Sequence, residues 1–257
     1  MYQEERLEAI INYLKIEKRI SVEQICSIFH VSRDTARRDL VKLEEIKAVI
    51  RTRGGAILPS AHHKIKDYTN RLNHVSAEKK RIGEKAASLI LPGDRVILDS
   101  STTVQACAES LSEEDCTVIT NSIHQAGILA GKRGIQIHLL GGELQKEHGF
   151  LYGSAVLDKL ANYHVEKAFI GLVGISAHGL TIAHEEDGMV KRRMLKQAEQ
   201  VIILADHSKM EITDFFKFAD LSEIDIVITD RELSENMMAV LEKNHVELLI
   251  ADTEETG

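Results

Sequence analysis

The sequence predicts an α/β protein, with an N-terminal winged helix-turn-helix followed by a larger Rossmann-like α/β domain. Three observations support this prediction. A basic helical segment and a Gly-Gly turn lie within the first 58 residues, short apolar runs alternate with helical stretches from residue 76 onward, and only two prolines interrupt the 257 residues. We therefore expect a winged helix-turn-helix in 1–58, a linker in 59–75 and the α/β domain in 76–257.

The net charge of -8 is distributed unevenly along the chain. Residues 1–60 hold 11 Lys and Arg against 9 Asp and Glu, and the remainder holds 21 against 31. Binding to nucleic acid depends on local basic patches, so the overall acidity does not exclude such a partner. No apolar stretch is long enough to cross a bilayer, and the first residues lack the pattern of a secretion signal. We therefore expect a cytoplasmic protein with no membrane partner.

The first 45 residues predict three helices. Apolar residues recur at helical spacing in 4–15, which indicates the first helix. Ser21 and Gln24 have the spacing of a capping box, so a short second helix begins there and ends near residue 30. Ser32 is the expected cap of a third helix. The apolar side of this third helix consists of Ala36, Leu40 and Leu43.

A turn of only three residues, 30–32, separates the second and third helices. Such a joint sets two helices at a steep angle, so that the third can lie in a DNA major groove. Residues 48–53 are β-prone and Gly54-Gly55 permits a turn, which together predict a two-stranded wing. A helical hairpin for protein contacts is the alternative. On the first interpretation the DNA contacts are Arg33, Thr35, Arg37, Arg38, Arg51 and Arg53, with Asp34 and Asp39 orienting the arginines.

The stretches VSRDTARRDLVKLEE (31–45) and IRTRGGAI (50–57) resemble the DNA-binding domain of the DeoR/GlpR family of bacterial sugar-metabolism repressors. The resemblance covers nearly the whole chain and implies a repressor that binds double-stranded operator DNA. The family typically has a VSxxTIRRDL helix and an RxHGGA wing, so Ala36 stands for the usual Ile and Arg53 for the usual His. We expect both positions near the DNA surface, where they would alter operator preference.

Seven short apolar runs punctuate the rest of the chain, and helical stretches separate most of them. This order is typical of an α/β sheet that is covered by helices on both faces. The runs are 95–98, 116–120, 135–140, 168–172, 201–205, 226–229 and 246–251.

Small and polar residues follow four of these runs. In an open α/β sheet, ligands bind at the carboxyl ends of the strands, where loops and helix N-termini converge. Hydroxyls and backbone N–H groups at the start of a helix suit a phosphate. We therefore predict a phosphate-type ligand site at this edge of the sheet. The segments are DSSTT (99–103), Thr120-Asn121, Gly141-Gly142 and DHSK (206–209).

DSSTT, GLVGISAHGLT (171–181) and ADHSK (205–209) also resemble the effector domain of the same family, whose fold is similar to ribose-5-phosphate isomerase and which binds a phosphorylated sugar. Ser101 replaces the glycine of the family pattern DxGTT, and Asp187 stands where Glu is more usual. The resemblance implies that Ser101, Thr102 and Thr103 hold the phosphate. It implies sugar or phosphate contacts from Asp99, Asn121, Asp187, Lys191 and Lys209.

Within the family, the stretches DTARRDLVKLEE (34–45) and HEEDGMVK (184–191) are most similar to the branch linked to glucose catabolite control. This makes a hexose 6-phosphate the leading candidate for the effector.

Two other classes of protein are open, namely a sugar-phosphate isomerase-like enzyme and a stand-alone sugar-phosphate binding protein. An isomerase needs a positioned carboxylate base. Related isomerases carry an acidic loop and a Glu before the next Lys, whereas this chain has GLVGI (171–175) and Val190-Lys191. We therefore expect binding without turnover and no catalytic residue. The run His184-Glu185-Glu186-Asp187 matches no metal-ligand spacing, so we expect neither a metal nor a cofactor.

These expectations combine into one hypothesis of regulation. A homodimer or homotetramer presents paired recognition helices to a palindromic or repeated operator, and the bound effector changes their spacing. By linkage, effector and DNA then change each other's affinity by the same factor. The sequence allows either sign, so the effector either releases the DNA or acts as a corepressor.

Overall fold

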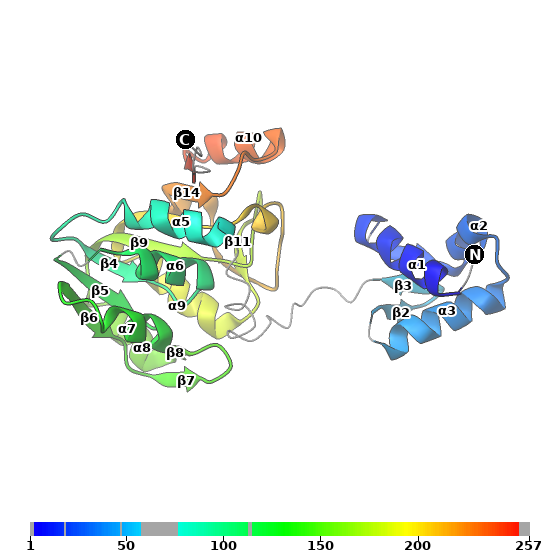
Figure 1. The fold of residues 1–257 in the computed structure, drawn as a ribbon, viewed down its shortest axis with the longest axis horizontal. Helices are drawn as coiled ribbons and strands as arrows, with labels where there is room; N and C mark the ends of the chain where they lie inside the picture. The colour runs from blue at the N-terminus through cyan, green and yellow to red at the C-terminus, as the bar shows by residue number, and fades with distance from the viewer. Residues whose placement is uncertain (1–2, 18, 47, 58–76, 113–114, 252–257) are drawn as a thin grey trace. The chain divides into compact units, whose positions relative to one another are not determined.

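The computed structural model describes residues 3–17, 19–46, 48–57, 77–112 and 115–251. The chain divides into two compact units, Met1–Lys64 and Ile65–Gly257, which are described separately below (Figure 1). The predicted linker, 59–75, lies outside the described residues, and so do residues 58 and 76 at the two expected domain boundaries. The three-segment division therefore stays a prediction in its details.

The first unit contains three helices and a small antiparallel sheet. The helices are α1 (Gln3–Glu17), α2 (Val22–Phe29) and α3 (Arg33–Glu45). The sheet has the order β1-β3-β2, with β1 at Arg19–Ser21, β2 at Ile50–Thr52 and β3 at Gly55–Ile57. The predicted wing is thus β2 and β3, but a third strand that the sequence did not indicate pairs with it.

Local chemistry explains where these elements begin and how closely they pack. Ser21 and Gln24 form the predicted capping box, with N–H···O distances of 2.8 and 3.0 Å. Ser32 caps α3 by accepting the Thr35 N–H at 3.2 Å. A Cβ at Gly55 would lie 2.1 Å from the carbonyl oxygen of Ile20, so glycine lets β3 approach β1.

The core of this unit lies between the three helices and the sheet. Ala36, Leu40 and Leu43 of α3 have no exposed surface, as predicted for the apolar side of that helix. Ile28 of α2 lies outside this core and is 43% exposed. The other fully buried members of this core are Ile10, Leu14 and Ile25.

The second unit is built on a seven-stranded, all-parallel sheet. Every run predicted from the sequence is one of its strands, which confirms the Rossmann-like α/β class. The strands are β4 (Arg95–Leu98), β5 (Cys116–Thr120), β6 (Ile135–Leu139), β9 (Val165–Gly171), β12 (Ala198–Leu204), β14 (Ile226–Thr229) and β15 (Glu247–Ile250). Their spatial order is β15-β14-β12-β9-β4-β5-β6, and each neighbouring pair is parallel.

Helices cover both faces of this sheet (Figure 1). One apolar cluster joins residues of α5 (Ala77–Ala87), α6 (Thr102–Ser110) and α7 (Ile123–Leu129) to one face. Another joins residues of α8 (Ser154–Leu160), α9 (Glu185–Leu195) and α10 (Glu235–Lys243) to the opposite face. Alternate side chains of one strand serve the two clusters: in β4, Val96 and Leu98 face one and Ile97 the other.

Two further small sheets lie outside the parallel sheet, and the sequence predicted neither. The hairpin of β7 (Glu143–Gln145) and β8 (Phe150–Tyr152) follows β6. An antiparallel sheet joins β10 (Gly174–Ser176), β11 (Gly179–Ile182) and β13 (Phe216–Ala219).

The strand order reverses between β4 and β9. From β4 the chain proceeds outward through β5 and β6, then returns to the other side of β4 and proceeds through β12, β14 and β15. A reversal of this kind opens a crevice at the carboxyl ends of the two central strands, which is the usual ligand site of open α/β sheets.

Candidate functional site

The exposed surface of α3 carries the side chains that were predicted to contact DNA. Arg33, Arg37 and Arg38 are exposed, and Thr35 is half-buried with its Oγ1 2.9 Å from the capping Ser32 Oγ. Arg33 pairs with Glu23 of α2 at 3.0 Å in an exposed bridge, which water screens strongly. The helix therefore presents a polar, largely basic face to solvent, as major-groove recognition requires.

The wing contributes two more exposed arginines. Arg51 lies on β2 and Arg53 lies in the turn between β2 and β3. Gly54 follows in this turn with φ of +90°, a conformation that favours glycine. The structure thus keeps all six predicted DNA-contact side chains at least partly accessible on one compact unit, and their contacts with DNA stay a prediction.

Asp39 does not orient these arginines, and that interpretation is wrong. Its carboxylate has no exposed surface and accepts hydrogen bonds from Arg6 of α1, at 2.5 and 3.1 Å, and from Gln3 Nε2 at 2.9 Å. The hydrogen bond to Asp39 raises the pKa of Arg6, so its guanidinium stays charged. Asp39 is therefore a structural anchor between α1 and α3.

Ala36 also departs from the expectation that it lies near the DNA surface. It has no exposed surface and packs in the core of the helix-turn-helix. A smaller side chain at this position acts on the packing of α3, and any influence on operator preference is indirect. Arg53, the other departure from the family pattern, is exposed.

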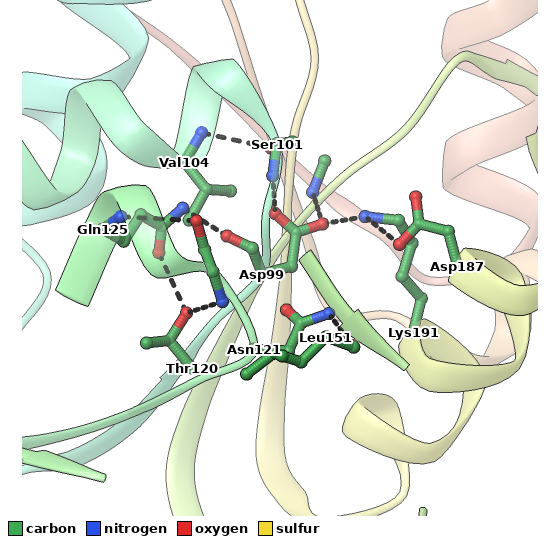
Figure 2. A network of polar contacts seen from close by, with 11 residues as sticks. Asp99, Ser101, Val104, Thr120, Asn121, Gln125, Leu151, Asp187 and Lys191 are labelled. Carbon is green, nitrogen blue, oxygen red and sulfur yellow. Dashed lines mark hydrogen bonds and ion pairs between the residues drawn. The ribbon is translucent and has the colours of Figure 1, made fainter. Parts of the chain in front are cut away.

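In the second unit, Asp99 lies at the centre of a buried polar network where β4 ends (Figure 2). Its carboxylate accepts the N–H of Ser101 at 2.9 Å and the N–H of Gly171, at the end of β9, also at 2.9 Å. It also accepts a hydrogen bond from Lys191 of α9. The hydrogen bonds of Asp99 therefore connect the ends of β4 and β9, the two strands of the switch point, to Lys191 of α9.

Lys191 and Asp187 complete an ionic cluster. Lys191 is 1% exposed, and its Nζ contacts Asp99 and lies 3.6 Å from Asp187 Oδ1, one helical turn away (Figure 2). Burying three charged groups costs several kcal/mol per ion before pairing. Such a cluster in a crevice is more typical of a ligand site than of a structural core.

The DSSTT segment opens α6 as predicted. Ser101 is the cap of this helix, and its Oγ accepts the Val104 N–H at 3.2 Å. Thr102 and Thr103 are buried in the first turn. Lys79 of α5 donates to Thr102 Oγ1 at 3.1 Å. The sequence reasoning missed Lys79, because its position beside α6 depends on how the two helices pack.

Ser101 also explains a glycine on the neighbouring strand. A Cβ at Gly171 would lie 2.1 Å from Ser101 Oγ and 2.4 Å from Ser101 Cβ. The serine at residue 101, where the family has glycine, therefore fits because residue 171 has no side chain. The end of β9 and the loop before α6 can then lie close together.

Thr120 and Asn121, at the end of β5, are buried beside this network. Thr120 Oγ1 accepts the Ser122 N–H at 3.0 Å, and Asn121 Nδ2 donates to the Leu151 carbonyl at 3.0 Å. No described residue donates a hydrogen bond to Asn121 Oδ1, although it is fully buried. An unpaired buried acceptor of this kind is costly and points to a donor that comes from outside the chain.

Of the eleven residues predicted to contact the effector, only Ser101, Asp187 and Lys191 line the cavity at the switch point. The other eight do not, namely Asp99, Thr102, Thr103, Thr120, Asn121, Gly141, Gly142 and Lys209. Gly142 packs against hairpin β7–β8 and α8, since a Cβ there would lie 2.5 Å from the Tyr152 carbonyl oxygen and from Val156 Cγ2. Gly141 precedes it, and neither lines the cavity. Lys209 lies in the short turn after β12 and is also absent from its lining.

The cavity at the switch point is small, with a volume of about 30 Å³, which is room for about one water molecule. His148, Phe150 and His184 line it together with Ser101, Asp187 and Lys191. His148 is buried and stacks on Phe150, with ring centroids 6.3 Å apart, and its centroid is 5.4 Å from that of His184. Sequence reasoning did not select the two histidines for this site, because single histidines in separate loops carry no motif.

In the described ranges, no group of three or more His, Cys, Asp or Glu side chains is arranged to hold a metal ion. No helix within those same ranges is both long and apolar enough to span a membrane.

A helix-turn-helix with an exposed basic helix, joined in one chain to an α/β domain with a polar crevice at its switch point, defines a ligand-responsive DNA-binding regulator. Family comparisons agree with this class. The model for the DeoR-like helix-turn-helix domain matches residues 6–62, and the model for the DeoR C terminal sensor domain matches residues 74–231. The chain belongs to the DeoR family and is a transcriptional regulator, not an enzyme.

Curated relatives match over almost their full length. The HTH-type transcriptional repressor GlcR of Bacillus subtilis (strain 168) is 64% identical over 255 residues, which cover 99% of each chain. The glycerol-3-phosphate regulon repressor of Escherichia coli (strain K12) is 31% identical over 250 residues, or 96% of this chain and 99% of that protein. Ribose 5-phosphate isomerase A from Methanocaldococcus jannaschii aligns with 51% of this chain and 53% of its own, at 17% identity and a TM-score of 0.38.

Proposed function

We propose that this regulator is a transcriptional repressor of carbohydrate metabolism genes, and that a phosphorylated sugar bound at the switch point of its sensor domain controls its affinity for operator DNA. The buried Asp99–Lys191–Asp187 cluster supports the proposal most strongly, because it concentrates ionised groups in a crevice where α/β sheets bind ligands. The relatives named above are repressors, and one is named for a glycerol-3-phosphate regulon.

The phosphate is expected at the start of α6. Thr102 and Thr103 lie in its first turn, where backbone N–H groups and the helix dipole favour an anion. Lys79 brings a cation to the same turn. Ser101 lines the cavity beside it and joins them as a phosphate ligand.

The sugar is expected to contact the ionic cluster. Lys191 is the cation that an entering phosphosugar meets, and Asp99 and Asp187 are acceptors for its hydroxyls. Because the cavity of about 30 Å³ is far smaller than a hexose phosphate, binding has to widen it. Competition between the ligand and the two carboxylates for Lys191 supplies a physical route from binding to movement of α9. Thr120 and Asn121 are proposed as additional contacts to the sugar. Lys209, Gly141 and Gly142 are the proposed contacts that the structure supports least.

DNA is expected to meet α3 and the wing. Arg33, Thr35, Arg37 and Arg38 would enter the major groove, with Arg51 and Arg53 on the adjacent backbone. Two or four copies of the chain would bind a palindromic operator, and the bound effector would reduce DNA affinity. The relatives are bacterial, and bacterial DNA lies in the cytoplasm, so we place the protein there.

A thermal-shift screen with sugar phosphates tests the effector part directly. A ligand at about 100 times its dissociation constant adds about 2.7 kcal/mol to the free energy of unfolding. We expect a hexose 6-phosphate to raise the melting temperature, and Thr102→Val to reduce the rise by removing one hydroxyl. If no sugar phosphate shifts the melting temperature of the folded protein, the effector proposal is wrong.

A further inference from the structure

A second cavity adjoins the one at the switch point. Its volume is about 240 Å³, and it is lined by Gln145, Phe150, Tyr152, His184 and Glu186. Phe150 and His184 also line the switch-point cavity, so the two cavities share these two residues. A ligand that begins at α6 and extends past these two residues would enter the second cavity, which we call the outer cavity.

The outer cavity carries negative charge. Glu186, in the first turn of α9, belongs to its lining, and among the residues that the structure describes no Lys or Arg does. Across the hairpin, Glu143 of β7 accepts the Tyr152 hydroxyl at 3.3 Å. The charge of Glu143, followed by burial and the charge of Glu186, raises the pKa of Tyr152. Two carboxylates thus act on Tyr152, which lines this cavity.

The inner end of the crevice has the opposite character. There the first turn of α6 offers backbone N–H groups to an anion, Lys79 lies beside Thr102, and Lys191 is paired with Asp99 and Asp187. A ligand that spans both cavities therefore meets lysines and helix N–H groups only at the inner end, whereas the lining of the outer cavity holds the carboxylate of Glu186. Complementarity of this kind selects among ligands mainly by rejecting those with the wrong charge.

We propose that the outer cavity receives the uncharged polyhydroxyl end of a sugar monophosphate, and that Glu186 accepts its hydroxyls and excludes sugars with a second phosphate. The inference rests on the proposed effector function and narrows its ligand to monophosphates. Phe150 and Tyr152 supply the apolar wall against which a sugar ring can pack, and Gln145 supplies an amide.

Calorimetric titration of the full-length protein tests the inference with matched ligand pairs. The probes are glucose 6-phosphate with glucose 1,6-bisphosphate, fructose 1-phosphate and fructose 6-phosphate with fructose 1,6-bisphosphate, and inorganic phosphate. We expect at least one monophosphate to bind about tenfold or more tightly than the bisphosphate of the same sugar. Glu186→Gln should tighten bisphosphate binding severalfold and leave the affinity for inorganic phosphate unchanged.

Glu185→Gln provides the matched control. Glu185 is the preceding residue of α9, is exposed, and lines neither cavity, so its loss of charge should leave the ratio of the two affinities unchanged. Bisphosphates that bind as tightly as monophosphates, or equal effects of the two substitutions, would overturn the inference while the proposed function stands. If none of the phosphosugars binds the folded protein, the proposed function is itself contradicted and the inference is lost with it.

Discussion

Neighbouring charged residues on α3 have opposite roles. Arg37 and Arg38 point to solvent, whereas the next residue, Asp39, is buried and bonded to Arg6. Helical periodicity places Asp39 on the same side as Ala36, Leu40 and Leu43, so its burial could have been anticipated. Its partner could not, because Arg6 is 33 residues away and no local pattern links the two.

Arg37→Ala and Arg38→Ala should each weaken operator binding by about 1 to 3 kcal/mol without changing the free energy of unfolding. Both side chains are exposed, so their removal leaves no buried partner unpaired. Gel-shift titration against an operator selected from random duplexes measures the first quantity, and urea denaturation measures the second. Unchanged operator affinity in both variants would remove α3 from the DNA interface.

Asp39→Asn is the contrasting variant. Breaking a buried ion pair by neutralising one partner costs about 3 to 5 kcal/mol, so this substitution should destabilise the helix-turn-helix itself. DNA binding would then be lost together with the fold, which the denaturation curve reveals. This difference separates a residue that contacts DNA from one that positions the helix.

At the sensor site, the sequence predicted some of the residues that lie together but not how they pair. Asp99, Asp187 and Lys191 were each expected to meet a ligand, and the structure shows them bonded to one another. His148 and His184 were not expected there, because they reach the cavity from separate loops. Residue type and strand-end position thus locate a site, whereas its internal pairing depends on side-chain distances.

Among the elements, the seven parallel strands and the two strands of the wing were predictable, and the other short antiparallel strands were not. Strands buried on both faces read as continuous apolar runs, and residues 95–98, 116–120 and 226–229 coincide with strand bounds. Strands β1, β7, β8 and β10 have three residues each, too few to show an alternation. The hairpin β7–β8 matters for function, because it supplies Phe150 and Tyr152 to the two cavities.

The close approach of β9 to the loop before α6 predicts a coupled pair of substitutions. Gly171→Ala should destabilise the sensor domain by about 1 to 3 kcal/mol, because the new methyl group overlaps Ser101. In a Ser101→Gly background the nearest remaining contact of that methyl group is Asp99 Oδ1 at 3.9 Å, so the same change should cost much less.

A double-mutant cycle from urea denaturation measures this coupling. Ser101→Gly alone should cost only a few tenths of a kcal/mol, since glycine is an acceptable helix cap. Equal costs of Gly171→Ala in the two backgrounds would show that Ser101 does not set the spacing between β9 and α6.

The contact between the first residue of β4 and β9 predicts a dependence on pH. Glu166 of β9 accepts the Arg95 backbone N–H at 2.7 Å and pairs with the Arg95 guanidinium. These bonds lower the pKa of Glu166 to about 2. A lowered pKa in the folded state contributes stability that is present above the ordinary pKa and is lost as the pH falls through about 2.

Glu166→Gln should therefore lower the free energy of unfolding at pH 7 by about 1 kcal/mol or less, given the partial exposure of the pair. The difference from the unsubstituted protein should narrow steadily as the pH falls below 4. Chemical denaturation between pH 7 and pH 3 gives this difference, with the exposed Glu232→Gln as the control. A difference that is constant over this range would show that Glu166 is not held ionised by Arg95.

For the molecule as a whole, the uneven distribution of charge agrees with a DNA-binding helix-turn-helix and a separate sensor domain. The net charge of -8 comes from the part of the chain that follows residue 60, and the helix-turn-helix holds more basic than acidic residues. An acidic sensor domain repels the DNA phosphates, so electrostatic attraction of DNA is expected at the helix-turn-helix alone. Composition predicted this arrangement, and the same sequence left the sign and size of the coupling between effector and DNA open.

We expect a sugar monophosphate bound at the switch point to control DNA binding elsewhere in the same chain. Operator affinity measured by fluorescence anisotropy, with and without a saturating hexose 6-phosphate, tests this control most directly. Operator affinity should fall by about 5- to 150-fold when the sugar phosphate is present. The response should be weaker or absent in Thr102→Val, which should still bind operator. Operator affinity that stays constant across the panel of sugar phosphates, in a protein that binds DNA, would contradict this expectation.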